Sequence, residues 1–321
     1  MLRSLYSGIS GLRAHQTMMD VTGNNISNVN TAGYKAAATL FQDTLSQTVA
    51  TGGRPQTPDR GGVNAAQIGL GVKLADIATN FRQGTQQPTG VGTDLMIQGD
   101  GFFIVQESGQ TLYTRSGGFH FDSDKNLVAP NGAYVMGYAP KAGGGVDTNT
   151  LVSMTLNADP ADLEPTTVGA MPGTPAIAAV VDDPATPADE TAAAVPAGPP
   201  TDAVMTSYAI SSTGEIIGQF NDDKSRVLGQ IVTATFVNPN GLEKAGNSTY
   251  RSNATITGTA DVGAAGTGGR GPMTSGSLEM SNVDLAQEFT NLIVAQRGFQ
   301  ANSRVITTSD ELLQELVNLK R

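Results

Sequence analysis

The two histidines of the chain, His15 and His120, are the side chains best suited to acid–base catalysis or metal binding near neutral pH. A transition-metal site needs further ligands at short, regular spacing. The chain has no cysteine, and neither histidine has a partner at ligand spacing. We expect His15 to lie on the surface of a helix. The histidines therefore predict neither a catalytic site nor a metal site.

Asp122, Asp124 and Asn126 have the alternating oxygen ligands with which a calcium-binding loop begins. Such a loop needs glycine at its sixth position and glutamate at its twelfth, where this chain has Leu127 and Ala133. We therefore expect these residues to form a β-turn and not an ion site.

Patterns for nucleotide binding and for nucleophilic catalysis are also incomplete. Gly69 and Gly71 do not complete a dinucleotide-binding fingerprint, because no strand, helix and acidic residue follow in order. No GxSxG motif occurs with a suitable histidine. The sequence predicts a protein that is not an enzyme and that holds no cofactor and no metal.

Both ends of the chain carry apolar residues that recur every seven positions. These positions are Leu2, Leu5, Ile9, Leu12, Met19 and Ile26 at the start, and Leu285, Leu292, Phe299, Ile306 and Leu313 at the finish. A repeat of 3.5 residues per turn is typical of a coiled-coil seam. We therefore predict two long helices whose apolar stripes serve self-assembly. The alternative is a pair of ordinary amphipathic helices at the edges of a globular domain.

The first helix is expected to run from about Leu2 to about Val29 and to end in a turn. Asparagine and threonine side chains in this turn hydrogen-bond to nearby backbone, and Gly33 tolerates positive φ, so we expect a sharp exit from the helix. The last helix is expected to begin at Ser281, with Asp284 at the spacing of a capping box. Lys320 and Arg321 at its end suit the helix dipole.

Between the two helices the pattern changes to short strands. Apolar residues alternate or run together between glycine, aspartate and asparagine turns, as in β-structure. The expected domains are a helical assembly domain from 1–35 and 281–321, a linker or extended stretch at 36–70, a β-domain from 71–141 and 205–275, and an insertion or small outer domain at 142–204. The predicted fold class is α+β and multidomain. Its terminal helices pair as a coiled-coil-like α-domain, with a nested all-β domain and a smaller inserted outer domain.

Charge and composition exclude several classes of function. The formal net charge is −10, and the region from Ala142 to Asp202 holds acidic residues and prolines but no lysine or arginine. Such a segment is a solvated insertion. No basic patch with interleaved aromatics is present, so we expect no nucleic acid partner. We also expect no membrane insertion and no cleaved signal peptide, because no apolar run is long enough and polar residues interrupt the first thirty residues.

Four motifs occur in order along the chain. They are LYSGISGL followed by GNNISNVNTAGYK, DLMIQGDGFF at 94–103, YTRSGGFHFD at 113–122, and the closing LEMSNVDLAQEFTNLIVAQRGFQANSRVITTSDELLQELVNLKR. Together they resemble the bacterial flagellar axial proteins of the rod and hook. The resemblance leaves only the acidic segment unmatched. It marks a motif turn at Asn24, Asn25, Asn28, Asn30, Gly33 and Tyr34. Ala32 departs from the pattern, because a proline commonly precedes the glycine, and this loosens the predicted turn.

The resemblance implies a structural subunit that polymerises helically into a hollow, bendable tube, which joins rod to filament and transmits torque. The implied partners are further copies of the chain, the flagellar rod, the hook cap, the hook–filament junction proteins and the flagellar export apparatus. The implied location is extracellular, in the hook and basal body, after export without a cleaved signal peptide.

Three functions stay open. The closing segment and the extra region between the β-halves are most similar to hook subunits. The long stretch from Asp43 to Gly71 resembles distal rod subunits. The third possibility is a surface-binding β-module that its helices merely dimerise.

Overall fold

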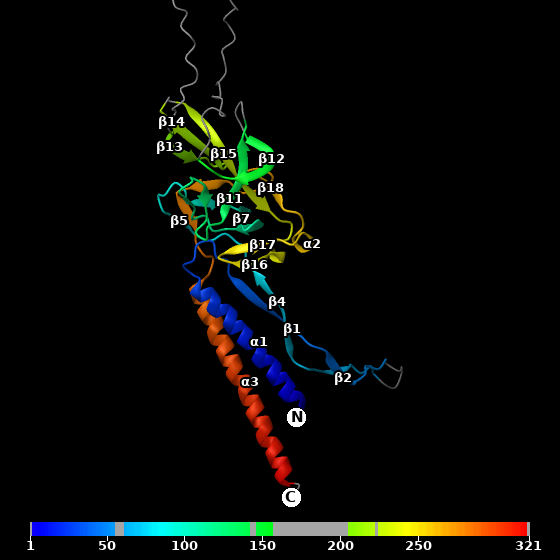
Figure 1. The fold of residues 1–321 in the computed structure, drawn as a ribbon. Helices are drawn as coiled ribbons and strands as arrows, with labels where there is room; N and C mark the ends of the chain where they lie inside the picture. The colour runs from blue at the N-terminus through cyan, green and yellow to red at the C-terminus, as the bar shows by residue number, and fades with distance from the viewer. Residues whose placement is uncertain (1, 55–60, 142–145, 157–204, 222–223, 320–321) are drawn as a thin grey trace, which may run out of the picture.

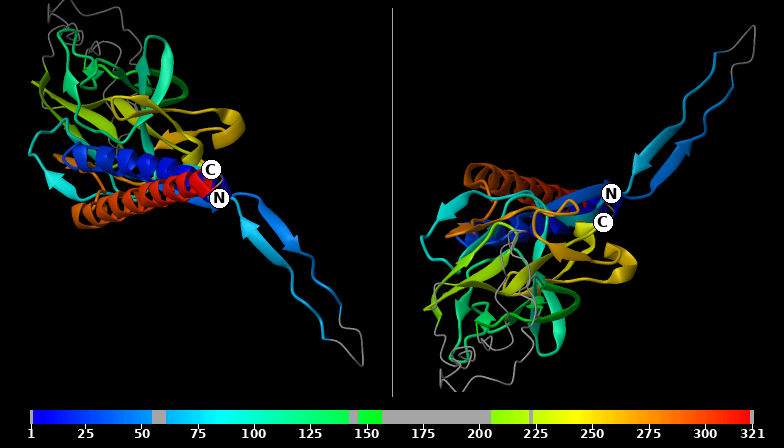
Figure 2. Two further views of the ribbon diagram at one scale, coloured as in Figure 1. Left: turned by 90° about the horizontal axis from the view of Figure 1, so that it is seen from below. Right: turned by 90° about the horizontal axis from the view of Figure 1, so that it is seen from above.

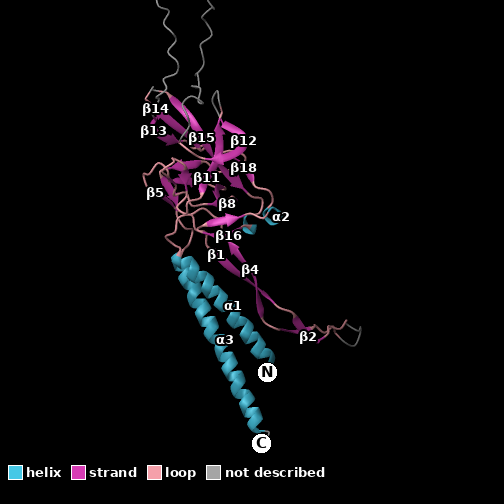
Figure 3. Ribbon diagram, viewed as in Figure 1, coloured by secondary structure: helices cyan, strands magenta, loops and turns pink. Residues whose placement is uncertain are grey.

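The protein is an α+β molecule with a helical pair at one end and a mostly β middle (Figures 1 and 3). A computed structural model describes residues 2–54, 61–141, 146–156, 205–221 and 224–319. Most of the acidic segment at 142–204, together with Lys320 and Arg321, lies outside these ranges.

The two terminal helices lie side by side and run in opposite directions (Figures 1 and 2). Helix α1 spans Leu2–Ser27 and helix α3 spans Leu285–Leu319. The capping box predicted at Ser281 is wrong. Asp284 is the cap, because its Oδ1 accepts hydrogen bonds from the backbone N–H groups of Ala286 and Gln287. None of the helices in the described ranges is long and apolar enough to cross a membrane.

A twelve-stranded antiparallel sheet system forms most of the β-region. Its main path runs β13-β14-β15-β11-β7-β8-β17-β16, and four further strands join at its sides. The path strands are β7 (Phe102–Glu107), β8 (Gln110–Thr114), β11 (Tyr134–Pro140), β13 (Met205–Ile210), β14 (Glu215–Phe220), β15 (Ser225–Thr235), β16 (Glu243–Gly246) and β17 (Thr249–Arg251). The side strands are β9 (His120–Phe121), β10 (Leu127–Val128), β12 (Val146–Ser153) and β18 (Asp261–Ala264).

Both faces of the sheet are covered, which explains the continuous apolar run in β7. Successive side chains of a strand point to opposite faces. Phe103 and Val105 accordingly join one core cluster, whereas Phe102 and Ile104 join the other. In the second cluster the rings of Phe81, Phe102 and Tyr250 meet edge to face.

Two small sheets connect the β-region to the helices. Strand β6 (Leu95–Ile97) pairs with β19 (Met273–Ser275), and β5 (Gln86–Pro88) pairs with β20 (Ser277–Glu279). Two short helical turns, η1 (Pro239–Gly241) and α2 (Ala254–Thr257), follow β15 and β17. Strands β5 and β6 precede the main sheet in sequence and β19 and β20 follow it, so the chain enters and leaves the β-region at the same place.

A long hairpin arm, described for residues 37–54 and 61–79, projects from the body beside α1 (Figures 1 and 2). It consists of β1 (Ala37–Asp43) paired with β4 (Val72–Thr79), and β2 (Ser46–Ala50) paired with β3 (Ala66–Gly69). The sequence analysis expected a linker or extended stretch at 36–70. The segment is extended, but it is not an unpaired linker, because its backbone groups pair with one another across the hairpin.

Candidate assembly site

The surface between α1 and α3 is lined by small residues. Four facing pairs set its register: Ser4 with Ser309, Gly8 with Ile306, Gly11 with Asn302, and His15 with Gly298. A methyl group at Gly11 would lie 2.5 Å from Asn302 Nδ2, so glycine is what lets the two helices approach. The contact positions on α1 alternate by four and three residues, the spacing that keeps one face of a helix against a partner.

His15 lies in this seam and not on the helix surface, so the expectation of a surface position is wrong. Its ring packs against Gly298, where a Cβ would lie 2.5 Å from His15 Nε2. The absence of a side chain at Gly298 makes the space for the imidazole. His15 Nδ1 is buried without a hydrogen-bond partner. We interpret the position of the ring as side-chain packing and not as a metal site.

The apolar stripes predicted from the heptad do not lie together in this seam, because Ile306 faces Gly8 within it whereas Ile9 lies at a groove between α1 and the hairpin arm. Leu5, Leu12, Met19, Ile26, Leu292, Ile306 and Leu313 are half-buried, and Ile9, Leu285 and Phe299 are exposed. Leu2 begins α1. Part of each stripe therefore remains uncovered within a single copy.

The start of α3 carries an exposed apolar face. Leu285, Phe289 and Ile293 follow one another at intervals of four residues and so lie on the same side of the helix. Phe289 and Ile293 are each 50% exposed. Side chains of this size cost free energy when left in water, so this face favours a partner.

Asn25, at the end of α1, connects four segments of the chain. Its side chain is buried and makes four hydrogen bonds to three other residues. The amide nitrogen donates to Ala37 O at 2.8 Å and to Glu288 Oε1 at 3.1 Å. The amide oxygen accepts from Ala37 N at 3.0 Å and from the Tyr34 hydroxyl at 3.1 Å. A fully satisfied buried amide of this kind fixes α1, the turn, β1 and α3 together.

The remaining residues of the motif turn have distinct positions. Asn24 and Asn28 bind each other, because Asn28 Nδ2 donates to the carbonyl and the side chain of Asn24. Gly33 has φ of +70°, the positive value that the sequence predicted, and its N–H donates to Glu279 O at 2.8 Å. Asn30 is exposed.

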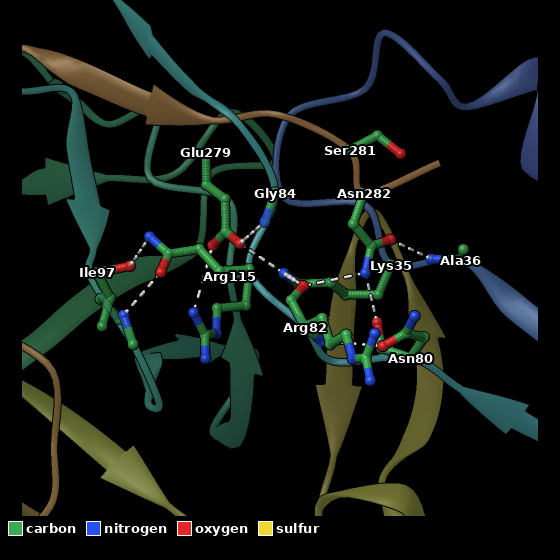
Figure 4. A network of polar contacts seen from close by, with 12 residues as sticks. Lys35, Ala36, Asn80, Arg82, Gly84, Ile97, Arg115, Glu279, Ser281 and Asn282 are labelled. Carbon is green, nitrogen blue, oxygen red and sulfur yellow. Dashed lines mark hydrogen bonds and ion pairs between the residues drawn. The ribbon is translucent and has the colours of Figure 1, made fainter. Parts of the chain in front are cut away.

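A buried ion cluster lies where the helices meet the β-region (Figure 4). Lys35 Nζ donates to Glu279 Oε1 at 2.5 Å and to Arg82 O at 2.8 Å. The other carboxylate oxygen of Glu279 lies 3.4 Å from Arg115 Nη1. Gly84 N–H also donates to Glu279 Oε1, at 2.8 Å. One carboxylate thus binds two cations and one backbone N–H.

The cluster is almost completely removed from water. The side chains of Lys35, Arg115 and Glu279 are 0%, 2% and 1% exposed. Burial lowers the pKa of Lys35, and the charge of Glu279 opposes this effect. Burial likewise lowers the pKa of Arg115, again opposed by Glu279. Glu279 is therefore the group that holds two buried cations in their charged forms.

Asn282 completes this junction on the side of α3 (Figure 4). Its Oδ1 accepts from Ala36 N at 2.9 Å, and its Nδ2 donates to Asn80 O and Arg82 O. The segment before α3 is thereby bound both to the segment after α1 and to the end of β4. Sequence reasoning missed Lys35, Arg115, Glu279 and Asn282. The available signal was the presence of charged or amide residues inside motifs that are otherwise apolar or turn-forming.

Asp122 and His120 lie in the β-region, away from the helix pair. Asp122 Oδ1 accepts hydrogen bonds from the N–H groups of Asp124 and Asn126, as in the predicted turn. The Asn126 side-chain amide donates to Asp122 Oδ2 and lowers the pKa of Asp122, and the backbone N–H bonds add to this effect. His120 lies exposed on β9. Within the described ranges, no group of three histidine, aspartate or glutamate side chains is placed to hold a metal ion.

Three family models match separate parts of the chain. They are "Flagella basal body rod protein" at residues 5–35, "Flagellar hook protein FlgE/F/G D1 domain" at 96–218, and "Flagellar basal body rod FlgEFG protein C-terminal" at 274–319. The first contains most of α1 and the motif turn, and the third begins just before β20 and Glu279. The matches therefore include both sides of the junction.

Several curated proteins are similar over long alignments. The flagellar basal-body rod protein FlgG of Bacillus subtilis is 41% identical, with all of both chains aligned. The flagellar hook protein FlgE of Borreliella burgdorferi is 33% identical, again over the whole of both chains. The flagellar hook protein FlgE of Helicobacter mustelae is 49% identical over 138 residues, which cover 42% of this chain and 30% of that protein.

Proposed function

We propose that this chain, which belongs to the family of flagellar hook and basal-body rod proteins, is a subunit of the flagellar hook. In this proposal copies assemble helically into a hollow, bendable tube that joins the rod to the filament and transmits torque. The work of the chain is structural, and no residue is assigned a catalytic role.

The observation that carries the proposal is the uncovered apolar face of the helix pair. Leu285, Phe289 and Ile293 are not among the facing pairs of the α1–α3 seam and are 40–50% exposed. Further copies of the chain would cover them. A contact between two different surfaces repeats without closing when the rotation does not complete a ring, and it then generates an open filament.

The proposed role of each part of the chain follows the domains expected from the sequence. Residues 1–35 and 281–321 would form a coiled-coil-like assembly domain that lines the channel, and the contact spacing along α1 supports this pairing. Residues 71–141 and 205–275 would form the β-domain outside it, except that β4 belongs to the arm. Residues 142–204 would form the inserted outer part, except for β12, which pairs with β11 in the main sheet. The arm would contribute contacts between copies, because Leu45, Val49 and Ile68 are exposed along it.

Two observations support the hook. A relative named as a hook protein aligns over the whole chain at 33% identity, and another has 49% identity over 138 residues, or 42% of this chain. The second observation is the long segment between β12 and β13, which holds most of the acidic insertion expected at 142–204. We further propose the rod, the hook cap, the hook–filament junction proteins and the export apparatus as partners, with an extracellular location reached without cleavage of a signal peptide.

A distal rod subunit is the second candidate. It is favoured by the long arm over Asp43 to Gly71 and by the 41% identity to a protein named as a rod protein. Electron microscopy of the purified chain tests both candidates. Curved tubes support the hook, and straight tubes support the rod. Discrete oligomers would contradict both and would favour a dimerised surface module.

A further inference from the structure

The C-terminal end of α3 extends past the start of α1. Ser309 lies opposite Ser4, and α3 continues for ten residues beyond Ser309, whereas α1 begins only two residues before Ser4. At 1.5 Å per residue the uncovered end of α3 is on the order of 10 Å long. We call residues 310–319 the α3 tail.

The α3 tail is amphipathic and acidic. Leu312 and Leu319, seven positions apart on one face of the helix, are 53% and 82% exposed. The tail also carries three acidic side chains and contains no basic residue; the acids are Asp310, Glu311 and Glu315. Lys320 and Arg321 follow it and lie outside the described residues. A short helix of this kind is suited to an apolar groove with a basic rim.

A groove with these properties lies between α1 and the arm. It has a volume of about 460 Å³ and is lined in part by Tyr6, Ile9, Leu70 and Val72. Arg13 and Lys73 lie at the same groove, and none of its described lining residues is acidic. We call this surface the α1–arm groove.

The tail of the same copy cannot fill this groove. The seam with α3 uses positions 4, 8, 11 and 15 of α1, whereas the groove uses positions 6, 9, 10, 13, 14 and 17. At 3.6 residues per turn the centres of these two sets lie on opposite sides of the helix. Because α3 is a continuous helix on the seam side, its tail points away from the groove of its own chain.

We propose that the α3 tail of one copy docks in the α1–arm groove of a second copy, with its apolar side chains in the groove and its carboxylates beside Arg13 and Lys73. The contact is heterologous, because each copy offers a tail and a groove, and it therefore propagates. It rests on the proposed function, since it names one contact within the polymer. It would place α1 between the α3 of its own chain and the α3 tail of a neighbour.

Cysteine cross-linking tests the docking directly, because the natural chain has no cysteine. In the full-length Ile9→Cys/Leu312→Cys variant, mild oxidation of the assembled protein should give a ladder of covalent dimers and higher multimers. The matched Val237→Cys/Leu312→Cys variant, whose Val237 is 92% exposed in the β-region, should give no ladder. Equal ladders in the two variants would overturn the proposal.

Charge reversal supplies the second test. Arg13→Glu/Lys73→Glu and Glu311→Lys/Glu315→Lys should each raise the critical concentration for assembly at least tenfold, and the four changes together should restore it. All four positions are exposed, so circular dichroism should stay unchanged. If the chain forms tubes but shows neither the specific cross-linked ladder nor the effect of charge reversal on the critical concentration, the docking is overturned and the proposed function is unaffected. Absence of any polymer from the unmodified chain would overturn both.

Discussion

Lys35 and Glu279 form a buried ion pair across 244 positions of sequence, and this pair fixes the segment after α1 to the strand before α3. The two terminal segments therefore reach the β-region as one unit. Assembly forces that act on the helix pair would pass through this junction. The stability of the ion cluster is accordingly the first property to test.

Glu279→Gln should destabilise the chain by about 3 kcal/mol or more, because it leaves Lys35 and Arg115 buried without a counter-charge. Lys35→Met should cost less, about 2 kcal/mol, because Arg115 and Gly84 N–H still bind the carboxylate. Urea unfolding of unassembled protein gives both values. The pair Arg270–Asp261, whose carboxylate is 67% exposed, supplies the control, since Asp261→Asn should change stability by less than about 1 kcal/mol. Equal losses for Glu279→Gln and Asp261→Asn would contradict this account.

Asn25→Ala should cost about 2–3 kcal/mol, because the backbone groups of Ala37 and the Tyr34 hydroxyl lose their buried partner. Asn30→Ala is the matched change in the same motif and should stay within about 0.5 kcal/mol, since Asn30 is exposed. Thermal unfolding by circular dichroism distinguishes the two. If Asn30→Ala proved as damaging as Asn25→Ala, the role assigned to Asn25 would be wrong.

Gly298→Ala should destabilise the helix pair, although alanine is the better helix former by about 1 kcal/mol. The reason is the His15 ring, which a Cβ at this position would meet at 2.5 Å. Gly23→Ala is the control, because nothing lies within 4 Å of a Cβ there, and this change should be neutral or stabilising. Adding His15→Ala to Gly298→Ala should recover part of the loss, as expected for two residues in direct contact. A stabilising effect of Gly298→Ala alone would refute the packing described here.

The sequence predicted the two long helices, the change to β-structure and the positive φ of Gly33. These features depend on local periodicity and on turn residues, which a single sequence displays. The last helix was placed four residues early, at Ser281, because Ser281 and Asp284 have the spacing of a capping box. Asp284 is itself the cap. Helix boundaries are decided by one or two hydrogen bonds, so pattern alone does not resolve them.

The hairpin arm and the ion cluster could not be predicted in this way. Strand β1 finds its partner β4 across the whole arm, and the glycine-rich sequence between them resembles a linker. Glu279 meets Lys35 and Arg115 only because the ends of the chain converge on the β-region. His15 was misplaced because its environment depends on Gly298, in the other helix. Each of these features results from contacts between segments far apart in sequence.

The central claim is that copies of the chain assemble through the exposed face of α3, and sedimentation of the Phe289→Ser/Ile293→Ser variant tests it most directly. The natural chain and a Gln296→Ser control should pellet as tubes. The double variant should stay in the supernatant at ten times the critical concentration of the natural chain, with unchanged thermal unfolding. Tubes from the double variant at the natural critical concentration would contradict the claim.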